Sequence, residues 1–305
     1  MSHKINLTKY WQKQQNNRAF SIVEISIVIL IISLLMAGIL NGTFLIGDAS
    51  LATAQKLTTN SDVNNMESLT LWLETSFSSS LEAQNNAKIE NNVKIASWKD
   101  ISPLKPVTKR LNLTQLTSNN QPEYKENVTE GLPMLYFKGS SNNFLEFTSQ
   151  NIVLADVLQN NQATIFMVYM FDKSANGTRL VRFGTTDVVN FGYDNRRIAI
   201  KFADDTLTEG SDSLKLETLQ MLTAVKNANN ISLYLNGNRR ASSTTSNSTI
   251  SDNNFGNAGI MRIRVGENFI GWLGEILVFN TALGNKERLQ VEQYLLTKYY
   301  TRYDH

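Results

Sequence analysis

The residue whose type and position most suggest a specific chemical role is Glu24, the one acidic residue of an otherwise apolar stretch. Residues 25–40 contain no charged side chain, and residues 20–23 in front of Glu24 are Phe, Ser, Ile and Val. A carboxylate in the middle of a bilayer costs about 2.5–3.5 kcal/mol, less near the interface, and generally marks a function. The sequence therefore predicts that Glu24 pairs with a positively charged partner.

Candidate catalytic groups are scarce in the rest of the sequence. The only histidines are His3 and His305, near the two ends, so the usual general base is missing from the body of the chain. Without cysteine there is no thiolate nucleophile, thiolate zinc site or disulfide. Retaining glycosidases use two carboxylates about 5–5.5 Å apart, and the E-x-D-x-x-E spacing that provides them in glucanases does not occur. We therefore expect no enzymatic activity, although two carboxylates meeting in a cleft would reopen that alternative.

Oxygen ligands for calcium are offered by four carboxylates with asparagines nearby. The residues concerned are Asp204, Asp205, Asp212 and Asp252. No D-x-D-x-D-G spacing joins them, which favours solvated loop carboxylates over a metal site. We therefore predict no cofactor, with calcium as the alternative.

Three further residues could either face a ligand or fill the core. Trp98 and Trp272 stand in expected strands, where packing in the core is the favoured interpretation. Glu275 precedes an apolar run in the last expected strand, which favours a buried carboxylate with partners of its own. Sugar binding through loop aromatics stays open.

The positive charge of the chain is concentrated in its first 19 residues. The segment 1–19 has four Lys and Arg residues and no acidic residue, so removing it lowers the formal net charge from +2 to −2. The rest of the chain, with a slightly negative net charge, is not expected to bind nucleic acid. The segment is instead typical of a basic leader in front of a membrane helix.

The apolar run over residues 20–47 is predicted to be a transmembrane helix. About 20 apolar residues cross a bilayer core as a helix, and all the leading positive residues precede the run, which keeps the N-terminus in the cytoplasm. Apolar residues from Leu51 to Met66 keep a helical spacing over residues 48–68. We expect this second segment to be a helical stem that packs one face on the following domain.

Two other interpretations of the N-terminal region are open. A secretory signal peptide has a shorter apolar region of about 7–15 residues and then a small-residue cleavage site. The run here is longer, and no such site follows it clearly. A plain single-pass anchor accounts for the length and the basic flank, but it gives no role to Glu24.

The residues around Glu24 resemble the processing motif of type IV prepilins and type II secretion pseudopilins. The stretch Arg18-Ala19-Phe20-Ser21-Ile22-Val23-Glu24 carries the likeness. It implies that a prepilin peptidase cuts between Ala19 and Phe20, that the new N-terminus at Phe20 is N-methylated, and that Glu24 acts in assembly. Family members usually have Gly before the cut, where this chain has Ala19.

This resemblance gives Glu24 a physical role. Cleavage would create a charged amine at Phe20, and the Glu24 carboxylate of one subunit would pair with the Phe20 amine of its neighbour in a filament. Opposite charges attract strongly where the dielectric constant is low. Such a pair would set the axial register of the subunits.

Residues 69–305 change to short alternating apolar runs separated by polar turns, which predicts an all-β sandwich. Asn236-Gly237 predicts a type I′ hairpin turn. Residues 285–300 have apolar residues at helical spacing and predict a C-terminal helix. The expected strands cover residues 69–73, 95–98, 134–137, 144–147, 164–171, 179–183, 188–193, 197–202, 221–225, 231–235, 261–265 and 269–279.

The same region resembles concanavalin A-like domains of the laminin G (LamG) type found in bacterial surface proteins. The likeness rests on short segments within residues 69–300, among them Ser97-Trp98-Lys99-Asp100, Tyr234-Leu235-Asn236-Gly237, 132–139 and 269–280. The implied fold class is an N-terminal transmembrane and stem helix followed by an all-β concanavalin A-like jelly roll with a C-terminal helix. These motifs are structural and identify no ligand.

Together these features predict a pilin-like or pseudopilin-like subunit, and a minor one, because so large a head would crowd a dense filament. The helix would lie in the bacterial inner membrane before assembly, and the head would be periplasmic or extracellular and serve adhesion or partner binding. Expected partners are a prepilin peptidase, other pilin subunits, membrane lipid and a carbohydrate or protein ligand, but not nucleic acid. A membrane-tethered glycan-binding protein that does not polymerise is the alternative.

Overall fold

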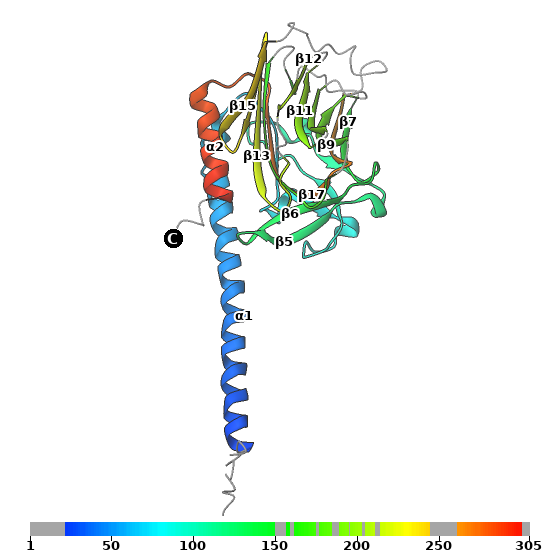
Figure 1. Ribbon diagram of the computed structural model, residues 1–305. Coiled ribbons are helices and arrows are strands. Elements are labelled where there is room, and N and C mark those ends of the chain that lie inside the picture. The colour runs from blue at the N-terminus through cyan, green and yellow to red at the C-terminus, as the bar shows by residue number, and fades with distance from the viewer. Residues whose placement is uncertain are drawn as a thin grey trace, which may run out of the picture. The chain divides into compact units, whose positions relative to one another are not determined.

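The computed structural model describes most of the chain after residue 21 (Figure 1). The described ranges are 22–149, 157–158, 162–174, 177–184, 189–194, 196–202, 205–210, 214–244 and 261–300, without the side chains of residues 37–46 and 194. Several predicted features lie outside these ranges, namely the leader 1–19, the cleavage site at Ala19 and Phe20, and the calcium candidates Asp204, Asp212 and Asp252.

Helix α1 spans Ile22–Thr59 and belongs to two compact units, Met1–Leu45 and Ile46–His305, which are described separately. Within the described residues, no helix combines the length and the apolar character that crossing a membrane requires. The side chains of residues 37–46 fall outside that description. The membrane span proposed for residues 20–47 therefore stays a prediction.

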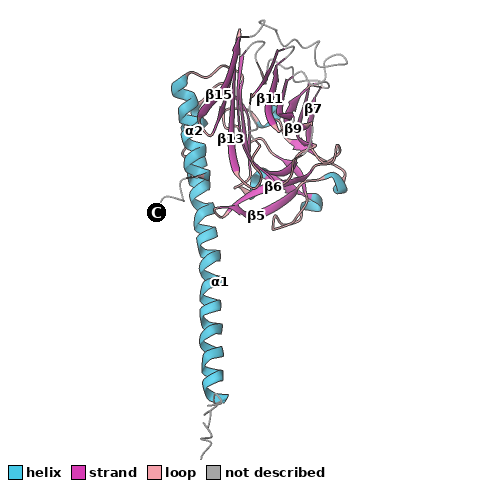
Figure 2. Ribbon diagram, in the orientation of Figure 1, coloured by secondary structure: helices cyan, strands magenta, loops and turns pink. Residues whose placement is uncertain are grey.

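The second unit is built on two β-sheets whose paired strands are antiparallel (Figure 2). Within the described residues one sheet has eight strands and the other nine. The eight-stranded sheet runs in the order β15 (Asn238–Thr244), β14 (Asn230–Leu235), β13 (Leu219–Asn227), β8 (Gln162–Phe171), β17 (Ile270–Phe279), β6 (Leu132–Lys138) and β5 (Glu123–Thr129), with β1 (Leu69–Glu74) paired to β17. The nine-stranded sheet runs in the order β12 (Asp205–Thr208), β11 (Arg197–Phe202), β10 (Val189–Asp194), β9 (Thr178–Phe183), β16 (Met261–Glu267), β7 (Leu145–Ser149), β4 (Leu113–Thr114), β3 (Ile95–Trp98) and β2 (Leu81–Ala83). Short 3₁₀ turns in the described loops cover Asp62–Asn65, Ser78–Ser80, Gln84–Asn86, Val107–Lys109 and Ser118–Asn120.

The main core fills the space between the two sheets. Ile165 and Met167 of β8 contribute to it from one sheet, and Phe191 of β10, Ile200 of β11 and Ile263 of β16 contribute from the other; all are fully buried. Successive side chains of a strand point to opposite faces of the sheet, so alternating apolar residues give each sheet an inner apolar face. The predicted all-β sandwich is confirmed.

A second core lies on the other face of the eight-stranded sheet, beneath the helices. Phe166 and Val168 of β8 point to this side, and Val291 and Leu295 of α2 belong to the same buried cluster. Helix α2 spans Asn285–Tyr299 and confirms the predicted C-terminal helix. Because β8 is buried on both faces, its sequence is a nearly continuous apolar run.

The part of α1 after residue 45 packs on this second core. Ser50, Ala54 and Thr58 are buried and lie four residues apart, which places them on one face of the helix. The helix ends at Thr59, so the helical stem predicted through residue 68 is too long. Asn64 accounts for the ending, because its side-chain amide donates hydrogen bonds to the Thr58 (2.9 Å) and Thr59 (3.1 Å) carbonyls, which an ending helix leaves open.

Two local predictions can be compared with the structure. The β14–β15 hairpin turns at Asn236 (φ 51°) and Gly237 (φ 76°), and both angles are positive, as a type I′ turn requires. Trp98 is fully buried, which confirms the core interpretation. Trp272 is only partly buried, and its ring contacts the Tyr136 ring with centroids 5.0 Å apart, so the core interpretation is only partly right there.

Candidate functional site

Glu24 lies in the first turn of α1. All described side chains over residues 22–36 are exposed, and the large apolar ones are 48–84% exposed. Ser26 and Ser33 donate their hydroxyl hydrogens to the carbonyl oxygens four residues earlier, at 2.6 and 2.7 Å. These hydroxyls are satisfied within the helix and do not depend on water. The first part of α1 thus presents an apolar surface on all sides, with one carboxylate near its start.

Two carboxylates meet inside the second unit. Glu74 of β1 and Glu275 of β17 are partners in the strand register, and both side chains are fully buried. Lys298 of α2 lies between them, with its Nζ 2.5 Å from Glu74 Oε1 and 2.8 Å from Glu275 Oε2. The hydroxyls of Thr58 on α1 and Tyr294 on α2 lie 2.9 and 3.2 Å from the same Nζ. We call these five residues the buried ion cluster.

The carboxylate oxygens of the buried ion cluster have further donors. Glu275 Oε1 accepts hydrogen bonds from the Trp72 indole and the Tyr294 hydroxyl, each at 2.7 Å. Glu74 accepts two backbone N–H groups just after β1, at 2.7 and 3.1 Å. Buried charges are tolerated when they are paired and hydrogen-bonded in this way. The prediction that Glu275 is a buried carboxylate with its own partners is confirmed.

The titration of the buried ion cluster follows from its burial. Burial raises the pKa of Glu275; Lys298 opposes that effect, and the neighbouring Glu74 adds to it. Burial alone would lower the pKa of Lys298, but Glu275 and Glu74 outweigh it, so the lysine pKa lies above its usual value. A paired-carboxylate hydrolase must reach a substrate, and these side chains have no exposed surface. The pair therefore serves to hold β1, β17 and both helices together.

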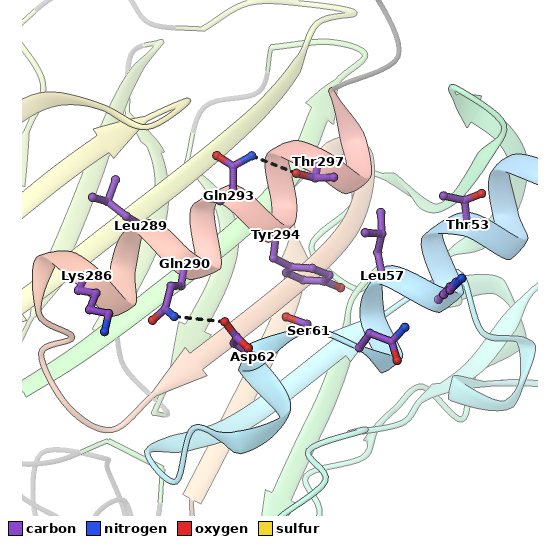
Figure 3. A pocket seen from close by; sticks show the side chains of 12 residues that line it. Thr53, Leu57, Ser61, Asp62, Lys286, Leu289, Gln290, Gln293, Tyr294 and Thr297 are labelled. Atoms are coloured by element: carbon purple, nitrogen blue, oxygen red, sulfur yellow. Dashed lines mark hydrogen bonds between the residues drawn. The ribbon is translucent and has the colours of Figure 1, made fainter.

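A surface groove lies between the end of α1 and α2 (Figure 3). It encloses about 780 Å³, and its apolar side chains include Leu57 and Leu289. Gln290 Nε2 donates to Asp62 Oδ2 across it at 3.2 Å. The other lining residues are Thr53, Lys56, Asn60, Ser61, Lys286, Gln293, Tyr294 and Thr297. Asp62 is the one carboxylate in this set, so these residues offer no pair of carboxylates.

The outer face of the nine-stranded sheet, opposite the main core, is polar from edge to edge. One residue from each strand aligns in register across it, in the order Thr206, Lys201, Asn190, Arg182, Arg264, Glu146, Thr114, Ser97 and Glu82. The strand neighbours of this row, among them Phe191, Phe183 and Ile263, point into the main core. The sheet therefore carries its polar residues on the single face that could meet a ligand.

Positive charge predominates on β7, β9, β10, β11 and β16. Their sequences contain six Arg and Lys residues against three Asp and Glu residues. Arg182 pairs with Glu267 at 3.1 Å, Arg262 with Glu146 at 3.3 Å, and Arg264 with both carboxylates. These ion pairs are partly solvent-accessible and leave this part of the sheet with a cationic excess.

A small hollow opens on the same face between β9, β10, β11 and β12. It encloses about 190 Å³ and is lined by Gly177, Arg179, Asn190, Gly192, Tyr193, Ala199, Ile200, Lys201 and Thr206. The register of β10 shifts between Phe191 and Gly192, which is a β-bulge. A Cβ on Gly192 would stand 1.9 Å from the Thr178 carbonyl oxygen, so only glycine fits there. The hollow exists because Gly192 and its register partner Ala199 are small.

The calcium candidates are not assembled in the described part of the chain. Among the described residues, no three acidic or histidine side chains stand close enough together to hold a metal ion. Asp205, the one candidate that is described, is 9% exposed and pairs with the buried Lys226 ammonium at 3.3 Å. An ammonium group so close competes with a cation for the same carboxylate.

Comparison with known proteins agrees with the sheet topology. Residues 142–287 match the family model Laminin_G_3, described as the concanavalin A-like lectin/glucanases superfamily. Over these residues the β-sandwich is similar to concanavalin A-like domains. No curated protein matches the chain.

Several solved structures resemble this concanavalin A-like domain at low identity. Domain 4 of AbnA, a GH43 extracellular arabinanase from Geobacillus stearothermophilus, is 14% identical with a TM-score of 0.41, over 57% of this chain and 80% of that one. Trypanosoma rangeli sialidase is 15% identical with a TM-score of 0.47, over 76% of this chain and 33% of the sialidase. The botulinum neurotoxin serotype D binding domain is 15% identical with a TM-score of 0.48, over 76% of this chain and 52% of that one.

The sequence interpretation missed both the hollow and the buried ion cluster as units. Arg179, Asn190 and Lys201 lie on three different strands, and only the register brings them together. One signal was available for the hollow. Gly192 interrupts the alternating pattern of its strand, and an isolated glycine in a strand often marks a bulge.

Proposed function

We propose that this chain is a prepilin-type subunit, of a type IV pilus or a type II secretion filament, that displays a ligand-binding concanavalin A-like head. The observation that carries the proposal is Glu24, the single carboxylate on a helical segment whose other large side chains are apolar and exposed. Such a surface must be covered by lipid or by other helices. A carboxylate in that setting is stabilised by pairing with a cation.

The processing motif supplies that partner. Cutting between Ala19 and Phe20 frees an amine at Phe20, four residues before Glu24. In the filament, the Glu24 carboxylate of one subunit pairs with the Phe20 amine of the next. Before assembly, the helix lies in the bacterial inner membrane with its basic leader in the cytoplasm. The partners are a prepilin peptidase, other pilin subunits and membrane lipid.

In this proposal the head binds its ligand and does not catalyse a reaction on it. The carboxylates of Glu74 and Glu275 are buried and paired with Lys298. The polar, cationic outer face of the nine-stranded sheet is the surface offered to a ligand, a carbohydrate or the surface of a protein partner. The buried ion cluster supports this role because Thr58 ties the end of α1 to the head. A load applied to the head would thus reach the stem helix.

N-terminal mass spectrometry of the membrane-extracted protein tests processing. The expected mature chain begins at N-methylated Phe20. A chain that keeps its first 19 residues overturns the prepilin assignment and leaves the plain anchor.

Filament incorporation separates assembly from tethering. Glu24→Gln removes the charge of the side chain without changing its shape. The amount of this variant in a sheared filament fraction should fall by at least about tenfold, because a buried charge that loses its partner costs about 3–5 kcal/mol. Glu67→Gln makes the same change at an exposed glutamate beyond the end of α1 and should have no effect on incorporation. Equal incorporation of both variants favours the membrane-tethered glycan-binding protein that does not polymerise.

A further inference from the structure

The hollow on the nine-stranded sheet contains a buried acceptor that lacks a donor. Asn190 is 8% exposed, and its Oδ1 accepts no hydrogen bond from the described part of the chain. A buried polar atom without a partner costs about 1–3 kcal/mol. Asn190 lines the hollow beside the bulge at Gly192, so a ligand seated there lies next to the side chain that carries this acceptor.

The rim of the hollow is cationic. Arg179 and Lys201 line it, and the lining residues that the structure describes include no Asp or Glu. The Arg179 guanidinium lies beside Gly177, at 3.9 Å from the position that a Cβ would take there. An Arg and a Lys on opposite sides of one hollow attract a carboxylate through charge-assisted hydrogen bonds.

The size of the hollow suits one small unit of a ligand. Its volume of about 190 Å³ corresponds to about six water molecules, which is the scale of one sugar residue and not of an oligosaccharide. The wall also offers the exposed Thr206 hydroxyl as a neutral polar contact. The set combines one acceptor for a hydroxyl with two cations for a carboxylate.

We infer that this hollow binds a single sugar acid, such as a uronic acid residue. A ring hydroxyl of the sugar donates to Asn190 Oδ1, and its carboxylate pairs with Arg179 and Lys201. The inference deepens the proposed function, since it names the ligand of the head. It concerns only the head, so processing at Phe20 and assembly through Glu24 are tested by separate experiments.

Binding is measured on the full chain in detergent micelles, by saturation-transfer difference NMR with three probes. D-glucuronate has both the hydroxyls and the carboxylate, D-glucose lacks the carboxylate, and acetate lacks the hydroxyls. We expect glucuronate to bind about tenfold more tightly than either of the others, since a charge-assisted hydrogen bond accounts for that difference. Its affinity should fall as NaCl is added. Equal binding of glucuronate and glucose, equal binding of glucuronate and acetate, or no binding of glucuronate overturns the inference.

Variants locate the ligand in the hollow. Ala199→Leu fills it and should weaken glucuronate binding about tenfold or more. Thr148→Leu makes a similar change at an exposed position of β7 on the same face, outside the lining residues, and should leave binding unchanged. Equal binding by both variants places the ligand elsewhere and overturns the inference.

Two milder variants distinguish a loss of ligand binding from a loss of folding. Lys201→Gln, on a partly exposed side chain, should remove most of the preference for glucuronate over glucose. Asn190→Asp should weaken the binding of glucuronate more than the binding of glucose. The new carboxylate still accepts a hydrogen bond from a hydroxyl, but it repels the carboxylate of the sugar acid. Thermal unfolding of each variant is followed alongside, and a folded Lys201→Gln chain with an unchanged preference overturns the inference.

Discussion

The buried ion cluster and the outer face of the nine-stranded sheet both gather charged residues, but they use them in opposite ways. In the cluster, Glu74, Glu275 and Lys298 are fully buried, and the described contacts supply each with partners. On the outer face, cations outnumber carboxylates, and the buried Asn190 oxygen accepts no hydrogen bond from the residues that the structure describes. Charges that are completely satisfied fix a structure, whereas charges and acceptors left open are available for recognition.

The strongest test of this contrast removes the one cation of the cluster. Lys298→Met leaves two carboxylates buried together, and we expect the free energy of unfolding to fall by about 3–5 kcal/mol. Chemical denaturation of the purified chain measures it. Lys286→Met, at an exposed lysine of the same helix, is the matched control and should change the value by less than about 0.5 kcal/mol.

A second change within the cluster provides an internal check. Adding Glu275→Gln to Lys298→Met should recover part of the lost stability, because one buried carboxylate has been removed. Simple additivity of the two losses would contradict the view that the charges act as a unit.

The contact between α1 and α2 through Thr58 should contribute less to the unfolding free energy than the central ion pairs do. Thr58→Val keeps the shape of the side chain but removes a hydroxyl that contacts Tyr294 Oη and Lys298 Nζ, each at 2.9 Å. We expect a loss of about 1–3 kcal/mol in unfolding free energy. Thr59→Val is the control, since the described contacts give that exposed hydroxyl one hydrogen bond, to the Gln55 carbonyl of its own helix. Equal losses from both variants would show that Thr58 adds nothing beyond helix propensity.

The pH dependence of stability should reveal the raised pKa of Glu275. A carboxyl group whose pKa is raised by folding binds its proton more tightly in the folded state, so stability falls as pH rises from the unfolded pKa of 4.5 toward the folded value. The slope while the proton is exchanged is at most about 1.4 kcal/mol per pH unit. Unfolding titrations of the wild type should show this fall, and Glu275→Gln should reduce it.

The raised pKa of Lys298 acts at the other end of the pH scale. Its contribution is complete below the unfolded pKa of 10.5 and is lost as pH rises through the folded value. The same titrations, extended to alkaline pH, should show a loss of stability that Lys298→Met lacks. A wild-type curve that is flat over both ranges would contradict the described coupling.

The smallest effect is expected on the outer face. Glu146 pairs with Arg262 and Arg264, but these side chains are 19–29% exposed. Glu146→Gln should therefore lower the unfolding free energy by no more than about 1 kcal/mol. A loss as large as that of Lys298→Met would erase the distinction between the two regions.

Much of the architecture could be predicted from the sequence because local patterns determine it. Alternating apolar residues predicted the sandwich, Asn236-Gly237 predicted the hairpin turn, and the spacing after Asn285 predicted α2. The length of the stem helix was predicted wrongly, because its end depends on Asn64 folding back onto the last helical carbonyls. That contact is a matter of three-dimensional position and leaves no periodic signal.

By itself, the sequence determined the apolar helix with Glu24, its likeness to a prepilin segment, and the concanavalin A-like sandwich. These features depend on residue type and on spacing along the chain. The tertiary structure alone decided that Glu74 and Glu275 share Lys298, and that Asn190, Arg179 and Lys201 surround one hollow. The physical reason is strand register: hydrogen bonding between distant strands sets which side chains meet, and neither composition nor local periodicity encodes that pairing.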